Sequence, residues 1–381
     1  MITEKIKYIG VNDHEIDLFE GQYRVPRGMA YNSYLITDEK IAVMDSVEIG
    51  FADRWLENIR SATSGRRPDY LIISHMEPDH SSSIKRFASA YPEAIIVSSA
   101  KAFLMMKGFF GCAFEDRRII VGDGDELSLG GRRLRFISAP MVHWPEVIMT
   151  YDPTDKILFS ADAFGKFGAL DIEDEWDPEA GRYYFGIVSK YGAQVQAVLK
   201  KAASLEIEAI CPLHGPVLKG DLGHYFNLYD IWSSYRAESE GVCIAYASIY
   251  GNTRAAAELL EAELCARGVT VALFDLARCD MHKAIESAFR YDRTVLASST
   301  YNCDIFPYMR SFLHGLVERN YQNRRVAFIE NGSWSPMATK VMKSMLEKSK
   351  NLSYAKTEVK LISALNSESV AQIFALAEEF S

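Results

Sequence analysis

The spacing of the apolar segments changes near residue 240, and this change predicts a chain of two domains. Up to about residue 235, short apolar strands alternate with tight turns and a few helices. From residue 241 onward, strands and helices alternate regularly, which is typical of a doubly wound parallel sheet. The polar stretch 233–241 separates the two patterns. We therefore expect domains at 1–238 and 239–381.

The expected elements follow from the apolar runs. In the first domain the strands are 32–37, 41–46, 70–75, 94–99, 117–121, 134–140, 147–152, 156–162 and 207–213, with helices near 50–61, 83–92, 100–109 and 191–204. In the second domain the strands are 242–248, 269–276, 294–300, 324–331 and 358–364, and the helices are 253–267, 281–290, 307–318, 336–349 and 367–380. We predict an α/β first domain with two sheets and outer helices, followed by a parallel sheet.

The composition is that of an acidic globular chain. Its 381 residues carry a formal net charge of -9, without the basic stripes that nucleic-acid or membrane surfaces need. No window approaches the roughly 18 apolar residues of a membrane span, and the N-terminus has no apolar run of signal length. We therefore expect a soluble, cytoplasmic protein that binds neither nucleic acid nor membrane.

The cysteines are scattered and form no C-x-x-C pair; they are Cys112, Cys211, Cys243, Cys265, Cys279 and Cys303. This spacing indicates neither a disulfide framework nor a thiolate metal site. A rubredoxin-type or iron–sulfur module is therefore not expected in this chain.

The apolar strand at 71–73 runs directly into a cluster of ionisable side chains, namely His75, Glu77, Asp79 and His80. The serines that follow begin a helix, so the cluster lies on a strand-to-helix loop. Three more such groups follow apolar strands in the same half of the chain: His143, Asp162 and His214. Strand ends of an α/β domain converge on one edge, where loops build sites. We expect all seven groups to lie together.

A metal centre is the simplest use of four histidines and three carboxylates in one place. Without a cation the carboxylates would repel one another, and each buried group would need its own partner. If Asp162 bridges two ions, each ion receives four protein ligands and keeps open positions for a small substrate. In the plainer interpretation, His143 and His214 are ordinary histidines and Asp79 caps a helix. That interpretation leaves the compact H-x-E-x-D-H cluster unexplained.

A second site is indicated where strand 242–248 ends and the next helix begins. The loop 248–253 combines hydroxyl groups, Gly251 and the N–H groups of a helix N-terminus, which together suit an anion. The chain contains neither G-x-x-x-x-G-K-[ST] nor G-x-G-x-x-G. A single phosphate monoester is therefore a simpler guest than ATP or a nicotinamide dinucleotide. A helix cap alone accounts for Thr253 about as well.

Two further loops, 298–304 and 330–336, follow strands of the same sheet at the edge where doubly wound sheets bind ligands. Tyr301 and Trp334 are candidates to flank a planar ring by stacking. In the plainer interpretation, both are half-buried aromatic residues of loops. Together the three loops predict an FMN site. Its expected contacts are Ser248, Ile249, Tyr250, Gly251, Asn252, Thr253, Ser299, Thr300, Tyr301, Asn302, Asn331, Gly332, Ser333 and Trp334.

The cluster H-x-[HE]-x-D-H after a strand resembles the metallo-β-lactamase fold, whose usual hydrolase form has a histidine where this chain has Glu77. With His143, Asp162 and His214, the pattern is similar to the flavodiiron proteins. The loop 248–253 resembles the flavodoxin phosphate-binding loop. The resemblance covers essentially the whole chain. It implies an N-terminal metallo-β-lactamase-like αββα sandwich and a C-terminal flavodoxin-like, doubly wound, five-stranded parallel sheet.

The resemblance also implies two non-haem iron ions bridged by Asp162. One iron would be held by His75, Glu77 and His143, and the other by Asp79, His80 and His214. FMN would pass electrons to this centre, which would reduce dioxygen to water, nitric oxide to nitrous oxide, or both. Because the same ligands would serve both gases, both substrates stay open. Tyr191 is a candidate hydrogen-bond donor to the centre, with a core aromatic as the plainer interpretation.

The electrons would come from an external donor: rubredoxin, another flavoprotein or a reduced deazaflavin. A flavin in one domain and metals in the other need to come close, and the resemblance implies a head-to-tail homodimer or a dimer of dimers. Two rival functions remain. One is a zinc hydrolase of the metallo-β-lactamase type fused to a flavodoxin-like domain, against which Glu77 argues. The other is an electron carrier with a structural first domain, against which the complete ligand set argues.

Overall fold

The computed structural model describes residues 2–381, which form two compact units. Unit 1 contains the residues up to Tyr184 together with Ala193–Asp230. Unit 2 contains Phe185–Gly192 and Ile231–Ser381. No helix among the described residues is both long and apolar enough to cross a bilayer.

The short segment Phe185–Gly192 belongs to unit 2 because its contacts lie there. The ring of Phe185 stacks on Phe289 with 4.5 Å between centroids, and the Tyr235 hydroxyl donates to the Ser189 carbonyl at 2.6 Å. Because Phe185–Gly192 belongs to unit 2 and Ala193–Asp230 to unit 1, no single boundary along the chain separates the two units. The domain boundary expected at residue 238 stays a prediction.

Unit 1 is built on two six-stranded sheets. The first has the order β1 (Ile6–Tyr8), β6 (Tyr34–Thr37), β7 (Ile41–Met44), β8 (Tyr70–Ile72), β9 (Ile95–Ser98) and β10 (Arg118–Ile120). The second has the order β11 (Glu126–Ser128), β12 (Arg133–Ser138), β13 (Ile148–Asp152), β14 (Ile157–Phe159), β15 (Ala209–Cys211) and β16 (Leu218–Lys219). Two small pairs join β2 (Val11–Asp13) to β5 (Met29–Tyr31) and β3 (Leu18–Phe19) to β4 (Tyr23–Arg24).

Alternate residues of the strands form the core between these two sheets. Tyr34 and Ile36 of β6 belong to the same buried cluster as Phe136 of β12 and Phe159 of β14. The rings of Tyr34 and Phe159 lie 5.5 Å apart. This period of two places alternate side chains on the face that turns toward the other sheet. Since β7, β8 and β9 are parallel, as are β14 and β15, loops at their carboxyl ends meet at one edge.

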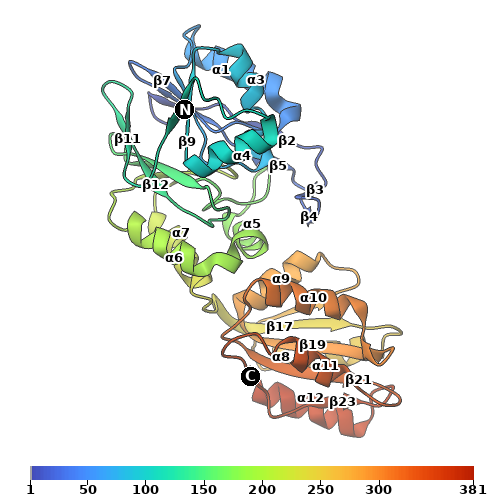
Figure 1. The fold of residues 1–381 in the computed structure, drawn as a ribbon. Helices are drawn as coiled ribbons and strands as arrows, with labels where there is room; N and C mark the ends of the chain where they lie inside the picture. The colour runs from blue at the N-terminus through green and yellow to red at the C-terminus, as the bar shows by residue number, and fades with distance from the viewer. Residues whose placement is uncertain (1) are drawn as a thin grey trace. The chain divides into compact units, whose positions relative to one another are not determined.

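Helices cover the outside of the two sheets. They are α1 (Ala52–Thr63), α2 (Pro78–Ser81), α3 (Ile84–Ala90), α4 (Ala100–Phe110), α5 (Trp176–Tyr183), α6 (Gly192–Ala202) and α7 (Leu222–Ser233). In Figure 1, α6 and α7 lie together on one side of unit 1 and α1 and α3 on the other, with the strands between them. This is the predicted αββα sandwich. Helices α5 and α7 were not predicted, because their aromatic residues obscure the helical period.

Unit 2 is the predicted parallel sheet. Its strand order is β18 (Val271–Asp275), β17 (Ser239–Ala247), β19 (Tyr291–Tyr301), β21 (Arg325–Asn331) and β23 (Val359–Leu361), all parallel. This is the flavodoxin-like order. The helices are α8 (Asn252–Ala266), α9 (Met281–Arg290), α10 (Pro307–Glu318), α11 (Ala338–Met345) and α12 (Ser367–Glu379). One face of the sheet packs on α8 and α12, and Figure 1 shows α9 and α10 on the opposite side.

Unit 2 also contains two short strands that were not predicted, β20 (Asp304–Ile305) and β22 (Ser353–Tyr354). Strand β20 folds back antiparallel on the end of β19. The turn between them contains Asn302 and Cys303, which both have positive φ, 50° and 58°. Two successive left-handed residues are the requirement of a type I′ hairpin turn. This hairpin lies at the sheet edge where the FMN contacts were expected.

Candidate metal centre and flavin cavity

The seven predicted ligands all follow strands of unit 1. His75 and Glu77 follow β8, and Asp79 and His80 lie in the first turn of α2. Pro78 occupies the start of this helix, where its fixed φ suits a first helical position. The others follow β12, β14 and β15 in the order His143, Asp162 and His214. Two sheets therefore contribute to one site.

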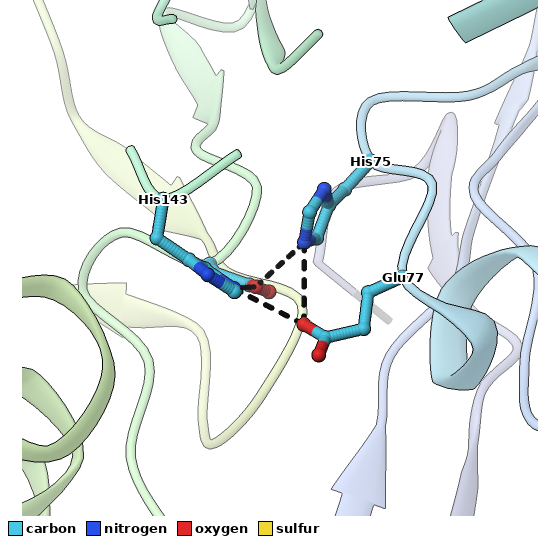
Figure 2. A group of neighbouring side chains, drawn as sticks. His75, Glu77 and His143 are labelled. Atoms are coloured by element: carbon cyan, nitrogen blue, oxygen red, sulfur yellow. Dashed lines mark hydrogen bonds and ion pairs between the residues drawn. The ribbon is translucent and has the colours of Figure 1, made fainter. Parts of the chain in front are cut away.

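One group of side chains consists of His75, Glu77, His143 and Asp162. The Glu77 Oε2 atom lies 3.3 Å from His75 Nε2 and 3.1 Å from His143 Nε2. Figure 2 shows the side chains of His75 and Glu77, from one loop, and of His143, from another, pointing toward one another. Two imidazole nitrogens and a carboxylate oxygen thus converge on one position.

The second group consists of Asp79, His80 and His214. The Nε2 atoms of the two histidines lie 3.0 Å apart. The Asp79 Oδ2 atom is 3.3 Å from His80 Nε2 and 3.2 Å from His214 Nε2. This group also offers two imidazole nitrogens and a carboxylate oxygen to one position.

Asp162 lies between the two groups and turns one carboxylate oxygen to each. Its Oδ2 atom is 2.9 Å from His143 Nε2 and 3.4 Å from His75 Nε2. Its Oδ1 atom is 3.3 Å from His80 Nε2. The side chain is 1% exposed. Asp162 therefore has the position of a ligand shared by two cations.

The polar atoms of the cluster fit a metal site better than a hydrogen-bond network. Both carboxylate oxygens of Asp79 and the Oδ1 atom of Asp162 are buried and accept no hydrogen bond within residues 2–381. Buried acceptors without donors are costly, because they have lost their water. A divalent cation in each group would satisfy these oxygens and the facing imidazole nitrogens together.

Protons balance the charges of this cluster in the metal-free chain. Burial alone lowers the pKa of His143, but hydrogen bonds with Asp162 and Glu77 outweigh it and raise that pKa to about 9. Burial opposes ionisation of Asp162, yet the charge of His75 and the hydrogen bond with His143 hold its pKa well below its usual range. Histidine protons and metal ions thus compete for the same nitrogens, so metal binding would release protons.

Two neighbours fix the orientation of the histidines. His75 donates from Nδ1 to Glu146 Oε1 at 2.7 Å, and His214 donates from Nδ1 to the Ala30 carbonyl at 2.7 Å. In both rings Nε2 is then the atom left to face a metal ion. Glu146 was not predicted from the sequence, although it lies only three residues after His143.

Aromatic rings form one wall of the centre. Phe19, Tyr31 and Tyr183 surround His214, with 5.2 Å, 6.1 Å and 5.5 Å between ring centroids. Burial, followed by the charge of Asp162, raises the pKa of Tyr183 well above its usual range. The sequence offered Tyr191 as a candidate hydrogen-bond donor, with a core aromatic as the plainer interpretation. The structure places Tyr191 in the 3-10 helix Ser189–Tyr191 of unit 2, and the tyrosine that lies against His214 is Tyr183.

A cavity of about 580 Å³ opens at the carboxyl ends of the strands of unit 2. Its lining contains twelve of the fourteen predicted FMN contacts, and adds Cys303, Ser335 and Ser363. The lining residues that the structure describes carry no charged side chain. An anionic group of a ligand would therefore be bound by hydroxyl and backbone N–H groups, as the loop 248–253 offers them.

Gly251 and Tyr301 are the two predicted contacts outside the cavity lining. Gly251 has φ of 96° immediately before α8 and donates its N–H to the Ser248 hydroxyl at 3.1 Å, so it shapes the loop. The ring of Tyr301 packs edge-on against Phe306 at 5.5 Å. The aromatic residues that line the cavity are Tyr250 and Trp334, which are 93% and 81% exposed.

A hydrogen-bonded network joins the loops around this cavity. The hydroxyl groups of Thr253 and Ser299 lie 2.9 Å apart, and Asn331 Nδ2 donates to the Ser363 carbonyl at 3.1 Å and toward Thr253 Oγ1 at 3.3 Å. Ser333 and Ser363 are joined through their hydroxyls at 2.7 Å. Four loops are thereby held in one arrangement. Ser363 was not expected, since the loop after the last strand carried no distinctive pattern.

Comparisons with known proteins agree with this two-part architecture. Residues 29–215 match the family model described as ODP family beta lactamase, and residues 243–362 match the model described as flavodoxin domain. The chain is 31% identical over 360 residues to a protein of Moorella thermoacetica named nitric oxide reductase. The match covers 92% of this chain and 90% of that protein.

Solved structures of similar proteins match the whole chain. The rubredoxin oxygen:oxidoreductase of Desulfovibrio gigas superimposes with a TM-score of 0.92 and 25% identity, covering 100% of this chain and 97% of that one. The flavodiiron protein of Giardia intestinalis also has a TM-score of 0.92, with 27% identity and coverage of 99% and 95%. Each of these known proteins therefore contains both domains in one chain.

Proposed function

The chain belongs to the flavodiiron protein family, and we propose that it is an oxidoreductase that reduces dioxygen to water, nitric oxide to nitrous oxide, or both. The observation that carries this proposal is the position of Asp162, with one carboxylate oxygen toward each ligand group. A flavin cavity in the same chain favours redox chemistry, because a hydrolase has no use for a flavin.

The donor atoms fit two non-haem iron ions. His75, Glu77 and His143 would hold one ion, and Asp79, His80 and His214 the other, with Asp162 shared. Imidazole and carboxylate ligands suit iron, and no thiolate belongs to either group. When bound, such a centre supplies electrons to a small gas molecule at open coordination positions. The protein's part is to hold both ions at a fixed spacing and to surround the gas with Tyr183 and the other aromatic side chains.

FMN is the cofactor proposed for the cavity of unit 2. Ser248, Thr253 and the N–H groups at the start of α8 would bind its phosphate. Tyr250 and Trp334, which line the cavity, would cover its ring. The remaining proposed contacts are Ile249, Gly251, Asn252, Ser299, Thr300, Tyr301, Asn302, Asn331, Gly332 and Ser333. Of these, Gly251 and Tyr301 would act through the shape of their loops.

The electrons would come from an external donor, because the chain has no paired cysteines for a rubredoxin-type site. Rubredoxin, a flavoprotein reductase or a reduced deazaflavin would serve. The metal centre and the flavin cavity belong to different compact units, which supports a head-to-tail homodimer or a dimer of dimers. Six free cysteines support a reducing, cytoplasmic location. Light scattering of the purified protein tests the oligomer.

The first experiment is to purify the protein without oxygen and to measure its metal and flavin content by elemental analysis and absorption. About two irons and one FMN per chain are expected. The loaded protein, supplied with a chemical reductant and a small rubredoxin, should then consume dioxygen or nitric oxide. Zinc at full occupancy without iron would support the hydrolase and overturn this proposal.

A matched pair of variants makes this test specific to the bridge. Asp162→Asn keeps the shape of the side chain and removes its charge, so it should lose iron and gas reduction while the flavin spectrum stays. Asp116→Asn removes an exposed carboxylate from the same unit and should change neither. Full gas reduction by Asp162→Asn would contradict the assignment.

A further inference from the structure

Asn32 is a completely buried polar residue that holds the turn carrying His214. Its side-chain Nδ2 atom donates to the Pro212 carbonyl at 2.8 Å and to the Gly215 carbonyl at 2.7 Å. Its own backbone N–H donates to the Leu213 carbonyl at 2.8 Å. Three hydrogen bonds from one residue therefore reach both sides of His214. We name residues 212–215 the His214 turn.

The segment that contains Asn32 also sets the direction of the His214 ring. The Ala30 carbonyl, in β5, accepts the hydrogen bond from His214 Nδ1 at 2.7 Å. Because Nδ1 is engaged in this way, Nε2 is the atom that faces Asp79 and His80, at 3.2 Å from Asp79 Oδ2 and 3.0 Å from His80 Nε2. The ring and the Ala30 carbonyl stay aligned as long as the His214 turn does not slide along β5. The hydrogen bonds of Asn32 prevent that movement.

The contribution of Asn32 depends on its amide group. Any residue at position 32 could offer a backbone N–H to Leu213, but two side-chain donations to two carbonyls need an amide nitrogen. Aspartate has the same shape and would turn an oxygen toward both carbonyls. The Pro212 carbonyl has a second donor in the Tyr34 hydroxyl, at 2.6 Å. Loss of the Asn32 side chain should therefore act mainly on the Gly215 side of the His214 turn, where a buried acceptor would lose its donor.

We propose that Asn32 is a positioning residue of the metal centre, which holds His214 Nε2 toward the ion bound by Asp79 and His80. The inference rests on the proposed function, because it assumes that this ligand group binds a metal ion. Side chains that orient a ligand commonly affect metal affinity almost as strongly as the ligand does. Since His214 belongs to one of the two ligand groups, Asn32 should raise the affinity for one of the two ions.

The test measures metal affinity without turnover. The metal-free protein and a chromogenic chelator compete for cobalt(II), and the wild type should bind two ions per chain. Asn32→Ala should bind one ion with the affinity of the wild type and the other about 10–100-fold more weakly. Two affinities within twofold of the wild type would overturn the proposal, and so would an equal loss at both positions.

A double-mutant comparison shows whether Asn32 acts through His214. His214→Ala removes the ligand itself, so adding Asn32→Ala to it should weaken cobalt binding no further. His143→Ala removes a ligand of the other group, and in that background Asn32→Ala should keep its full effect. Effects of Asn32→Ala and His214→Ala that simply add would overturn the proposal.

Asn58 provides a control of the same chemical kind. Its Nδ2 atom donates to the Ile9 carbonyl at 3.1 Å and to the Gly10 carbonyl at 3.0 Å, in a segment that carries none of the seven ligands. Asn58→Ala removes the same pair of hydrogen bonds and should leave both cobalt affinities unchanged. If Asn58→Ala weakens one ion as Asn32→Ala does, general destabilisation explains both results and the proposal is overturned.

A smaller substitution covers the case in which Asn32→Ala does not fold. Asn32→Ser keeps one donor in a shorter side chain and should lose affinity for the same single ion, by less than the alanine variant. A folded Asn32→Ser that binds both ions as the wild type does would overturn the proposal.

The failure of this inference is distinguishable from the failure of the proposed function. Two cobalt ions bound equally by wild type and Asn32→Ala would remove the role of Asn32 and leave the metal centre intact. An iron-loaded wild type that consumes neither gas would remove the proposed function, while the cobalt affinities would still decide the role of Asn32. A chain that binds no cobalt at these ligands would overturn both.

Discussion

His75 donates from Nδ1 to the Oε1 atom of Glu146 at 2.7 Å, and both side chains are completely buried. The same oxygen accepts the Met76 N–H at 2.9 Å, so Glu146 is held at two points. The charge of Glu146 contributes to raising the pKa of His75, against the effect of burial. This pair keeps the His75 ring turned with Nε2 toward Glu77 and Asp162.

Replacing Glu146 by Gln should therefore weaken metal binding without removing a ligand. The amide keeps the shape and loses the charge that orients and polarises His75, which typically costs about 10–100-fold in metal affinity. Competition between the protein and a chromogenic chelator for cobalt(II) measures this change. Glu93→Gln, at an exposed position of the same unit, is the matched control. Unchanged affinity in Glu146→Gln would show that the Nδ1 partner is dispensable.

The metal-free protein should lose stability as the pH rises from about 6.5 to about 9. The pKa of His143 is about 9 in the folded chain, against about 6.5 in the unfolded chain. A raised pKa stabilises the fold below the unfolded value, and this contribution disappears as the pH passes the folded value. We expect a loss of the order of 2 kcal/mol in the free energy of unfolding, measured by urea titration.

The metal-loaded protein gives the control for this pH dependence. Metal ions replace the histidine protons, so its free energy of unfolding should not fall over the same range. The lowered pKa of Asp162 acts in the opposite direction along the pH scale. It stabilises the folded chain above about pH 4, and this stabilisation is lost on acidification. A metal-free stability that stays level or rises between pH 6.5 and 9 would contradict the charge balance described for the cluster.

Much of the metal centre was predictable because its ligands follow strong local patterns. Each of the seven follows an apolar strand, and four lie within the six residues 75–80. Glu146 carries no such pattern. It is a single acidic residue in an irregular segment, and its place beside His75 depends on how distant loops pack. The expected alternation of strand and helix likewise predicted unit 2 but not the hairpin that forms β20.

Two tyrosines, Tyr183 and Tyr191, show why other residues beside the metal centre were not predicted from the sequence. Tyr183 and Tyr191 lie in one aromatic segment, and the helical period cannot be extended from one to the other. After α5 the chain passes through a π-helical turn at Tyr184–Val188 and then a 3-10 turn. Each change of helix type rotates the following side chains. Tertiary packing therefore decides that Tyr183 lies beside His214.

Tyr183→Phe should slow gas reduction while metal content and folding stay unchanged. The phenol is buried beside His214, and its raised pKa keeps it protonated as a hydrogen-bond donor. Loss of a positioned proton donor typically costs about 100-fold in kcat. Tyr191→Phe, in the same segment, should be neutral and is the matched control. Equal kcat for wild type and Tyr183→Phe would make this tyrosine a packing residue only.

The hydroxyl groups of the loop 248–253 give the last prediction, which concerns the phosphate of FMN. The Ser248 hydroxyl already accepts the Gly251 N–H, and the Thr253 hydroxyl already pairs with Ser299, so both are held in place before any ligand arrives. Hydrogen bonds to charged groups contribute about 1.5–3 kcal/mol each. The double variant Ser248→Ala with Thr253→Val should therefore bind FMN about 100-fold more weakly.

Riboflavin, which lacks the phosphate, is the matched ligand for this variant. Titration of the flavin-free protein, followed by flavin fluorescence, should show nearly equal riboflavin affinity in variant and wild type. Ser311→Ala, at an exposed position of α10, should leave both affinities unchanged. If FMN and riboflavin weaken equally, the two hydroxyls hold the loops together and do not contact the phosphate. If neither affinity weakens, the phosphate of FMN does not bind at the loop 248–253.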